Sequence, residues 1–385
     1  MSEQPVILHY LQRDNYGGGP KNILTVLDHY DGVARQHVAT AGSGKLTAAC
    51  PTGRTVCFHR LINLPVGLFP LAALQLVFLL RRLRPDVVIT HGQWGGLIMG
   101  LALLFAPKCA SIFICQWCSL YHSTDAYRAF RNFVVEWLTF KTHRQIVCVS
   151  EGNVRQFMYA GLLADRDRVA VIPNSLDRAE LAADGVGSAS DCASRRDEEA
   201  AKFIFLGRLE HQKRPDWLLR AWKTACDAGL QKARLLVLGD GVLRAESERL
   251  ASQLGIAGSV SFLGYCPDSA KHLRAADALV LTSLFEGHAN VVLEAMACGK
   301  PVIAMAADGV QESFTDGVEG HLVNLGDTEA FARRIVELAS DPVQRRRMGE
   351  RGLERARRFS TDEQRVAYQA LLSRALNPKT ETLTA

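Results

Sequence analysis

Two glutamates flank the start of a helix in the second half of the sequence. The stretch SLFEGHANVVLEAMACGKP, from Ser283 to Pro301, places Glu286 on a loop and Glu294 in the first turns of a helix that begins near Asn290. The free N–H groups and partial positive charge of a helix start favour a diphosphate. The two carboxylates could bind diols on opposite sides of that diphosphate, which is the layout of a nucleotide sugar. A loop glutamate and an unrelated helix-surface glutamate would show the same spacing.

Two cations follow an earlier strand of the same half. Arg208 and Lys213 lie between an apolar run that ends at Leu206 and a helix opened by Pro215. Together they could neutralise a leaving diphosphate without a metal ion, so we expect no obligatory metal and no other cofactor. A Gly-Arg pair and a lysine in a loop are common, but their place at the first strand end of a domain favours a phosphate site.

Short apolar runs alternate with helical stretches along the chain. The runs are rich in β-branched residues and lack polar alternation, which is typical of parallel strands buried on both faces. The expected strands are 6–9, 56–59, 86–90, 111–114, 146–149 and 169–172 in the first half, and 203–206, 235–238, 260–263, 278–282, 301–304 and 321–323 in the second. The predicted fold class is therefore α/β, with two doubly wound, Rossmann-like domains and parallel sheets.

A polar stretch separates the two halves. Residues 178–201 lose hydrophobicity and gather Gly, Ser, Asp and Arg, so we expect a hinge or linker at 176–201. The domains would then span 1–175 and 202–360, with a last helix at 361–377 that returns to the first domain. Closure of the domains would bend the chain near 174–178 and near Ser360.

These residues resemble one known family, the retaining glycosyltransferases of family 4 with the GT-B fold. The resemblance spans nearly the whole chain and implies two facing domains with an inter-domain cleft. It rests on Gly207-Arg208-Leu209 with Lys213, Gly239-Asp240-Gly241, Phe262-Leu263-Gly264-Tyr265, the Glu-x7-Glu pair Glu286 and Glu294, Gly309-Val310-Gln311-Glu312, Val149-Ser150-Glu151 and Ile172-Pro173-Asn174.

The resemblance implies a role for each matching residue. Arg208 and Lys213 would bind the donor diphosphate and stabilise it as it leaves. Glu286 would hold hydroxyls of the transferred sugar, and Glu294 would bind the ribose diol. The backbone of 264–266 would flank the base, and the glycines at 17–19 would let main chain approach the phosphate or acceptor. The donor-binding set is Gly18, Gly207, Arg208, Lys213, Gly264, Tyr265, Cys266, Glu286, Gly287, His288, Ala289, Asn290, Val291 and Glu294, of which Arg208, Lys213 and Glu286 are catalytic; the acceptor and sugar side has Gly17, Gly19, His91, Gln116 and His122.

One position departs from the family pattern. Members commonly carry a histidine after the strand that here spans 111–114, and this chain has Gln116 at that place. Glutamine can hydrogen-bond a sugar hydroxyl but cannot change charge. His122 or His91 would then contribute near the sugar, although a histidine in a loop is also commonly a surface or structural residue.

The same loop raises a metal interpretation. Cys115, Cys118 and His122 have a zinc-like spacing, with Cys109 as a fourth candidate. Cys109 precedes the expected strand and Cys115 follows it, so the two thiols would lie about 20 Å apart at about 3.3 Å per residue. Only three ligands would remain, and we expect no metal site.

The composition narrows the classes of partner. With 385 residues, 48% of them hydrophobic and 22% charged, the chain is typical of a globular protein of two domains. The net charge of +5 is too small for dedicated nucleic-acid binding. Residues 1–177 carry 17 Lys and Arg against 11 Asp and Glu, so this half could contact anionic lipid head groups or phosphates, although a solvated surface often has such a balance.

Two sequence features bear on location. No secretory signal pattern opens the chain and the ten cysteines follow no disulfide-like spacing, so we expect a reducing cytoplasm. The uncharged stretch from Leu61 to Leu80 could just span a bilayer. Pro65, Pro70 and Gln75 favour instead a buried helix at 71–84, with peripheral membrane contact as the alternative.

The leading interpretation is an enzyme that moves a sugar from a UDP- or GDP-sugar to an acceptor hydroxyl with retention, forming an α-linkage in polysaccharide or glycoconjugate biosynthesis. The acceptor would be a glycan, a lipid-linked molecule or a small molecule. Two alternatives stay open. An epimerase of the same fold would release products without an acceptor, and a non-catalytic nucleotide-sugar-binding scaffold of a glycan assembly would be supported by Gln116 alone.

Overall fold

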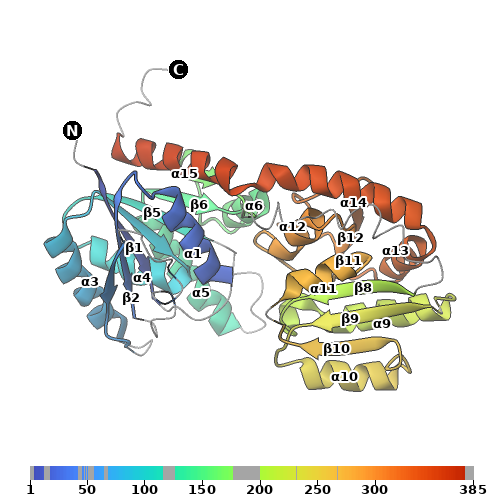
Figure 1. The fold of residues 1–385 in the computed structure, drawn as a ribbon. Helices are drawn as coiled ribbons and strands as arrows, with labels where there is room; N and C mark the ends of the chain where they lie inside the picture. Colours follow the sequence, from blue (N-terminus) through green and yellow to red (C-terminus); the bar gives the residue numbers. More distant parts are fainter. Residues whose placement is uncertain are drawn as a thin grey trace. The chain divides into compact units, whose positions relative to one another are not determined.

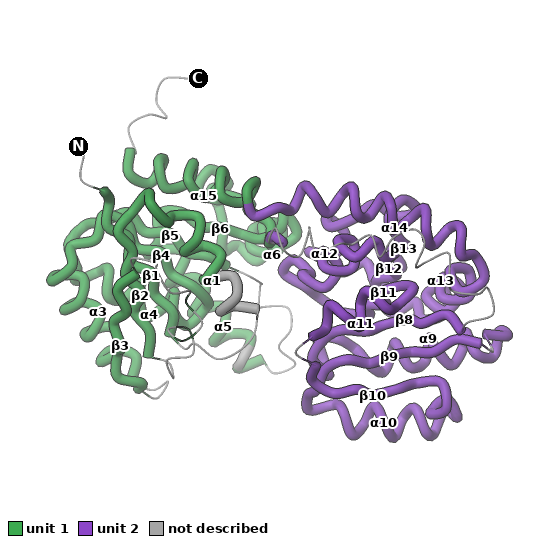
Figure 2. Tube along the Cα trace, in the orientation of Figure 1, with its two compact units in different colours: residues 1–174, 362–385 green, residues 175–361 purple. Residues whose placement is uncertain are grey.

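The chain forms two compact α/β units. The computed structural model describes residues 4–12, 18–41, 46, 48, 50, 56–64, 68–115, 126–176, 200–230, 232–266 and 268–377. The first unit comprises residues 1–174 and 362–385, and the second comprises 175–361 (Figure 2). Most of the expected linker at 176–201 lies outside the described residues.

The first unit is a seven-stranded parallel sheet covered by helices on both faces (Figure 1). The strand order is β3-β2-β1-β4-β5-β6-β7, so the order reverses between β1 and β4. The strands are β1 (Val6–Leu11), β2 (Arg35–Thr40), β3 (Val56–Arg60), β4 (Val87–His91), β5 (Ala110–Cys115), β6 (Gln145–Cys148) and β7 (Val169–Val171). The helices are α1 (Gly18–His29), α3 (Phe69–Leu83), α4 (Gln93–Leu103), α5 (Ala126–Thr142), α6 (Glu151–Tyr159) and α15 (Thr361–Leu376).

The second unit is a six-stranded parallel sheet in the order β10-β9-β8-β11-β12-β13. Its strands are β8 (Ala201–Leu206), β9 (Ala233–Leu238), β10 (Val260–Gly264), β11 (Ala278–Leu281), β12 (Val302–Met305) and β13 (Gly320–Val323). Its helices are α9 (Pro215–Asp227), α10 (Arg244–Gln253), α11 (Ser269–Ala275), α12 (Asn290–Ala297), α13 (Thr328–Ser340) and α14 (Pro342–Ala356). The order reverses between β8 and β11, and doubly wound sheets bind ligands at such a point.

The predicted fold class is confirmed, and every expected strand is present. The pattern missed one strand, β2, because its sequence RQHVAT begins with polar residues. Gln36 is nevertheless buried, since its side-chain Nε2 donates to the carbonyl of Leu27 over 2.9 Å. A polar side chain with one hydrogen bond replaces an apolar one there, so β2 lacks the unbroken apolar run from which the other strands were predicted.

The stretch from Leu61 to Leu80 does not form one long helix. Residues 61–64 are extended, and α3 begins only at Phe69, with Pro70 in its first turn. The buried residues of this helix are Ala73, Leu76, Val77 and Leu80. Among the described residues, no helix combines the length and the apolar character that crossing a bilayer requires.

The last helix, α15, packs on the first unit. The hydroxyl of Tyr30, after α1, donates to the carbonyl of Tyr368 over 3.0 Å, and the ring of His29 stacks on that of Tyr368. Near the point where the chain passes between units, the backbone N–H of Leu176 donates to the carbonyl of Phe359 over 2.8 Å. The two connecting segments therefore run side by side, and residues 177 and 178 of the expected hinge lie outside the described residues.

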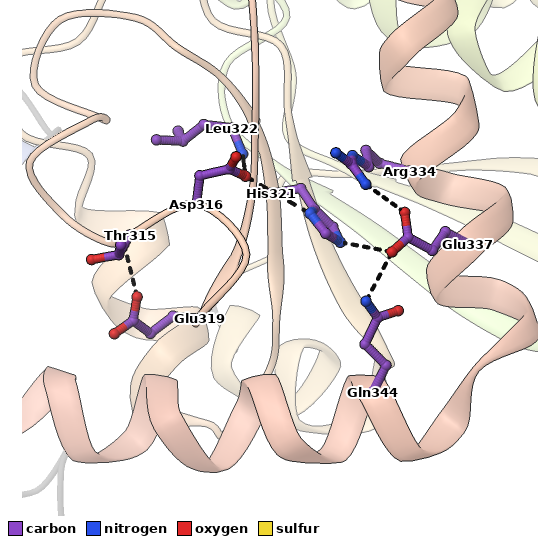
Figure 3. A network of polar contacts seen from close by, with 8 residues as sticks. All are labelled: Thr315, Asp316, Glu319, His321, Leu322, Arg334, Glu337 and Gln344. Carbon is purple, nitrogen blue, oxygen red and sulfur yellow. Dashed lines mark hydrogen bonds and ion pairs between the residues drawn. The ribbon is translucent and has the colours of Figure 1, made fainter.

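A polar network fastens the edge strand β13 to two helices (Figure 3). The carboxylate of Glu337 on α13 accepts from Gln344 on α14 and from Arg334, over 2.8 and 2.7 Å. The ring of His321, on β13, is buried between this carboxylate and that of Asp316, at 3.6 and 3.8 Å. The network therefore holds α13 and α14 beside the edge strand β13.

Buried histidines make the first unit sensitive to acid, among them His9, His91 and His143. Burial lowers the pKa of His9 and of His143 to about 4, and it lowers the pKa of His91 well below its usual value. In the unfolded chain these rings would titrate near pH 6.5. Between pH 4 and pH 6.5 the unfolded state therefore binds more protons than the folded unit. The stabilisation that is present above pH 6.5 is lost as the pH falls toward 4.

We therefore expect the free energy of unfolding of the first unit to decrease from pH 6.5 to pH 5, by on the order of 1 kcal/mol per pH unit for each such histidine. Thermal unfolding followed by circular dichroism would measure it. His143→Gln should flatten the pH dependence, because the variant lacks one of the buried rings. A transition temperature that is constant over this range would contradict the assignment.

Candidate functional site

Two loops meet at the carboxyl edge of the second sheet. Residues 207–214 follow β8 and residues 282–289 follow β11, and these strands are neighbours at the point where the order reverses. The hydroxyl of Thr282 lies 3.0 Å from the carbonyl oxygen of Lys213 and 3.1 Å from that of Arg214. The fully buried Thr282 thus fixes the end of one loop to the start of the other.

Gln212 makes a second connection between the loops. Its carbonyl accepts from the backbone N–H of Leu284 over 2.8 Å, and its side-chain Nε2 donates to the carbonyl of Phe285 over 2.9 Å. Neither Gln212 nor Thr282 was among the predicted site residues. A polar residue at the end of a buried strand was the available signal for Thr282.

These connections bring Lys213 and Glu286 together. The Lys213 Nζ donates to the Glu286 Oε1 over 2.5 Å, and the two side chains are only 13% and 10% exposed. A charge-assisted hydrogen bond that is largely shielded from water is stronger than a surface ion pair. From the sequence, each residue was expected to contact a different part of the substrate, and the structure pairs them with each other.

Arg214 orients the segment that carries Lys213. It has a left-handed backbone conformation, with φ +46° and ψ +57°, at the start of α9. Its guanidinium forms two hydrogen bonds with Asp216, of 2.8 and 2.6 Å, and lies 3.8 Å from the centre of the Trp217 ring. These contacts offset the strain of a non-glycine residue in this conformation.

A glycine lets a third loop pack against the Glu286 loop. Gly309 has φ +77°, and a Cβ there would lie 2.1 Å from the carbonyl oxygen of Gly287. The backbone N–H of Glu286 donates to the carbonyl of Asp308 over 3.2 Å. Any side chain at 309 would therefore push apart the loops that place the Glu286 carboxylate.

Arg208 pairs with a different carboxylate, that of Glu210. Its side chain is 68% exposed, and its Nη1 donates to the Glu210 Oε1 over 2.9 Å. The residue before it is Gly207, and a Cβ at this position would lie 3.2 Å from Cε of Lys213. Arg208 would have to leave Glu210 to reach a phosphate beside Lys213.

The helix that follows Glu286 begins without a side-chain cap. Ala289 is its N-cap residue and offers no side-chain hydrogen bond. Gly287 and Ala289 are buried, and Asn290 and Val291 are half-buried. Glu294 lies half-buried one turn into α12.

His288 supports the loop from inside. Burial lowers its pKa to about 4, so the ring is neutral near pH 7. The ring packs against Phe359, with centroids 5.3 Å apart, and its Nε2 lies 3.5 Å from the Ser313 hydroxyl. A contact from this position to a donor would come from the backbone.

The residues expected near the base lie at the end of β10. Gly264 has φ +74°, and its carbonyl accepts from the backbone N–H of Gly239 over 2.8 Å. Tyr265 is 73% exposed, and Cys266 is half-buried. The exposed ring of Tyr265 is available for stacking.

The residues predicted on the acceptor side are only partly described. Gly18 and Gly19 open α1, whereas Gly17, Gln116 and His122 lie outside the described residues. His91 ends β4 and is buried, with its Nε2 3.4 Å from Nδ1 of His9. The two rings are stacked, with centroids 5.7 Å apart.

The candidate metal ligands are also only partly described. Cys115 is the last residue of β5 and does not follow it as expected, while Cys118 and His122 lie outside the described residues. In the part of the chain that the structure describes, no group of three or more His, Cys, Asp or Glu is placed to hold a metal ion.

Comparison with known families identifies both halves of the chain. The family described as Glycosyltransferase Family 4 matches residues 28–180, and the family described as Glycosyl transferases group 1 matches residues 190–355. The chain belongs to the family 4-type glycosyltransferases.

Curated relatives and solved structures are similar to this chain in sequence and in fold, respectively. The lipopolysaccharide core biosynthesis glycosyltransferase LpsE of Rhizobium meliloti (strain 1021) is 39% identical over 176 residues, which is 46% of this chain and 50% of LpsE. A D-inositol 3-phosphate glycosyltransferase of Thermomonospora curvata is 33% identical over 214 residues, covering 52% of this chain and 50% of the relative. The chain thus spans about half the length of these curated relatives. HepE of Anabaena, solved in complex with UDP and glucose, has a TM-score of 0.78 at 20% identity and covers 96% of this chain and 100% of its own, so it shares the GT-B fold.

The Thr282 contacts lead to a test of the loop connection. Thr282→Val keeps the shape of the side chain and removes the hydroxyl, so we expect a loss of about 0.5–1.5 kcal/mol in the free energy of unfolding of the second unit. Nucleotide affinity should also fall, because the loop of Lys213 is released. Thr282→Ser is the matched control and should retain both properties in thermal unfolding and calorimetry. Equal nucleotide affinity in Thr282→Val and the native chain would contradict this role.

Proposed function

We propose that the protein transfers a sugar from a uridine diphosphate sugar to an acceptor hydroxyl with retention of the anomeric configuration. The observation that carries the proposal is the shielded pair of Lys213 and Glu286 beside the uncapped start of α12. A cation, a carboxylate and a helix N-terminus match a diphosphate joined to a polyhydroxyl group. HepE, which was solved in complex with UDP and glucose and with UDP-glucose, supports uridine as the base.

Donor binding would exchange partners within this pair. The Lys213 ammonium would move from the Glu286 carboxylate to the incoming diphosphate, and Glu286 would then accept hydrogen bonds from sugar hydroxyls. Each buried charge would keep a partner throughout, which avoids the free-energy penalty of an isolated charge. Arg208 would swing from Glu210 to the same diphosphate.

The transfer itself requires no nucleophile from the protein. The bond between the anomeric carbon and the phosphate oxygen breaks while the bond to the acceptor oxygen forms on the same face. The acceptor proton passes to the leaving phosphate oxygen, so charges and atoms balance. Lys213 and Arg208 would stabilise the negative charge that develops on the diphosphate. Glu294 would bind the ribose diol equally before and during the reaction.

The acceptor class follows from chemistry and from relatives. We propose a hydroxyl of a glycan or of a lipid-linked glycan, with support from LpsE, a relative named for lipopolysaccharide core biosynthesis. Because side chains and a helix N-terminus would carry the phosphate charge, we also propose that no metal is obligatory.

The proposal is tested by turnover of single variants. Lys213→Ala and Arg208→Ala should each lower the rate of transfer by about two orders of magnitude or more, since loss of one charge-stabilising donor costs about 3–4 kcal/mol of barrier. Lys223→Ala, in an exposed ion pair with Asp227 on α9, is the matched control and should keep native turnover. Glu294→Ala should mainly weaken donor affinity.

Product analysis by NMR and mass spectrometry completes this experiment. We expect an α-linked product that forms only when an acceptor is present. Its rate of formation should be unchanged after treatment with EDTA. Native turnover in both cation variants would overturn the diphosphate assignment. Release of an epimer without acceptor, or activity restored only by Mg²⁺ or Mn²⁺, would overturn the reaction as proposed.

A further inference from the structure

The outer face of α3 is apolar and open to solvent. The inner face of this helix packs on the sheet through Leu76, Val77 and Leu80, whereas Leu71, Leu74 and Phe78 point outward at positions i, i+3 and i+7. We call the exposed set the α3 surface; it comprises Leu68, Leu71, Leu74, Phe78, Leu104 and Phe105, each at least 42% exposed. Phe78 and Phe105 are 64% and 68% exposed, which is unusual for side chains of this size.

Two helices contribute to this surface. Leu104 and Phe105 follow α4, which lies beside α3 (Figure 1). The Arg81 Nη2, in the last turn of α3, donates to the carbonyl of Phe105 over 3.2 Å. This bond holds the end of α3 against the turn after α4, so the apolar side chains of both elements form one patch.

Cations gather at one end of the patch. Arg81, Arg82 and Arg84 end α3, Lys108 follows Phe105, and all four are exposed. Between residues 61 and 124 the sequence contains a single acidic residue, Asp86. Its carboxylate accepts from the backbone N–H of Val6 over 2.8 Å, so it is bound at the amino end of the central strand β1.

We propose that the α3 surface docks on an anionic lipid bilayer. An amphipathic helix that combines outward apolar side chains with Lys and Arg lies in the head-group layer, with its apolar face among the acyl chains and its cations on lipid phosphates. A partner protein would need its own acidic groups opposite these cations, because potentials across a protein interface are complementary, whereas anionic head groups supply that charge beside a layer that accepts the apolar side chains. The surface lies within the first unit and does not depend on the proposed sugar transfer.

The depth of this contact is limited by the fold. A helix of 15 residues is about 22 Å long, which is shorter than the hydrocarbon core of about 30 Å. Its buried side is also part of the unit's core. The helix therefore lies on the bilayer and does not cross it. If the chain is cytoplasmic, as expected from the sequence, the leaflet that it meets carries the negative surface potential that its cations require.

Vesicle binding of the full chain tests the proposal. The native protein should float with phosphatidylcholine vesicles that contain phosphatidylglycerol, bind pure phosphatidylcholine vesicles at least tenfold more weakly, and lose affinity as salt increases. The triple variant Leu71→Ser, Leu74→Ser and Phe78→Ser should reduce binding at least tenfold, and so should Arg82→Glu with Lys108→Glu.

Two control variants match these changes elsewhere. Val343→Ser with Val366→Ser removes exposed apolar side chains from α14 and α15, and Arg346→Glu with Arg347→Glu makes the same charge change on α14. Both should bind vesicles like the native chain, and circular dichroism should show that all variants are folded. Equal binding by the native chain and the triple variant, or no binding by the native chain, would overturn the proposal. A concentration-dependent oligomer that the triple variant abolishes, without vesicle binding, would assign the surface to a second copy instead.

Discussion

The ion pair between Lys213 and Glu286 is the interaction around which the candidate site of the second unit is arranged. The two residues are 73 positions apart in the chain, and they meet because β8 and β11 are neighbours at the reversal of strand order. Gln212 then fixes one loop to the other through two hydrogen bonds, and the Thr282 hydroxyl adds a third whose proton lies between the carbonyls of Lys213 and Arg214. A site assembled this way is held ready before any ligand arrives, which lowers the entropic penalty of binding.

The two units differ in how their cores are built. The second unit has one continuous hydrophobic core, from Leu176 to Ala356, that supports its loops on all sides. The first unit has several smaller cores on the two faces of its sheet, and one of them is completed by Tyr368 and Leu371 of the last helix. The exposed apolar face of α3 belongs to this unit.

Sequence reasoning succeeded where local pattern decides structure. The buried strands were predicted from their β-branched residues, and Lys213 and Glu286 lie, as the pattern indicated, in loops that follow strands of the second half. Their mutual contact was not foreseen, because it depends on cross-loop hydrogen bonds from Thr282 and Gln212 that no local spacing encodes. The strand β2 was missed because Gln36 occupies a buried position with a hydrogen bond in place of an apolar side chain. For the stretch before Leu80, hydropathy predicted a buried helix, but it could not distinguish the side packed on the sheet from the equally apolar side that faces solvent.

The central claim is that Lys213 is held by Glu286 until a diphosphate takes its place. Calorimetric titration of UDP, which has the diphosphate and lacks the sugar, tests this exchange most directly. In Glu286→Gln the lysine has lost its competing carboxylate, so UDP should bind as tightly as to the native chain or severalfold more tightly, whereas Lys213→Met should bind it at least tenfold more weakly. Native UDP affinity in Lys213→Met, or loss of UDP binding in a folded Glu286→Gln variant, would contradict the account.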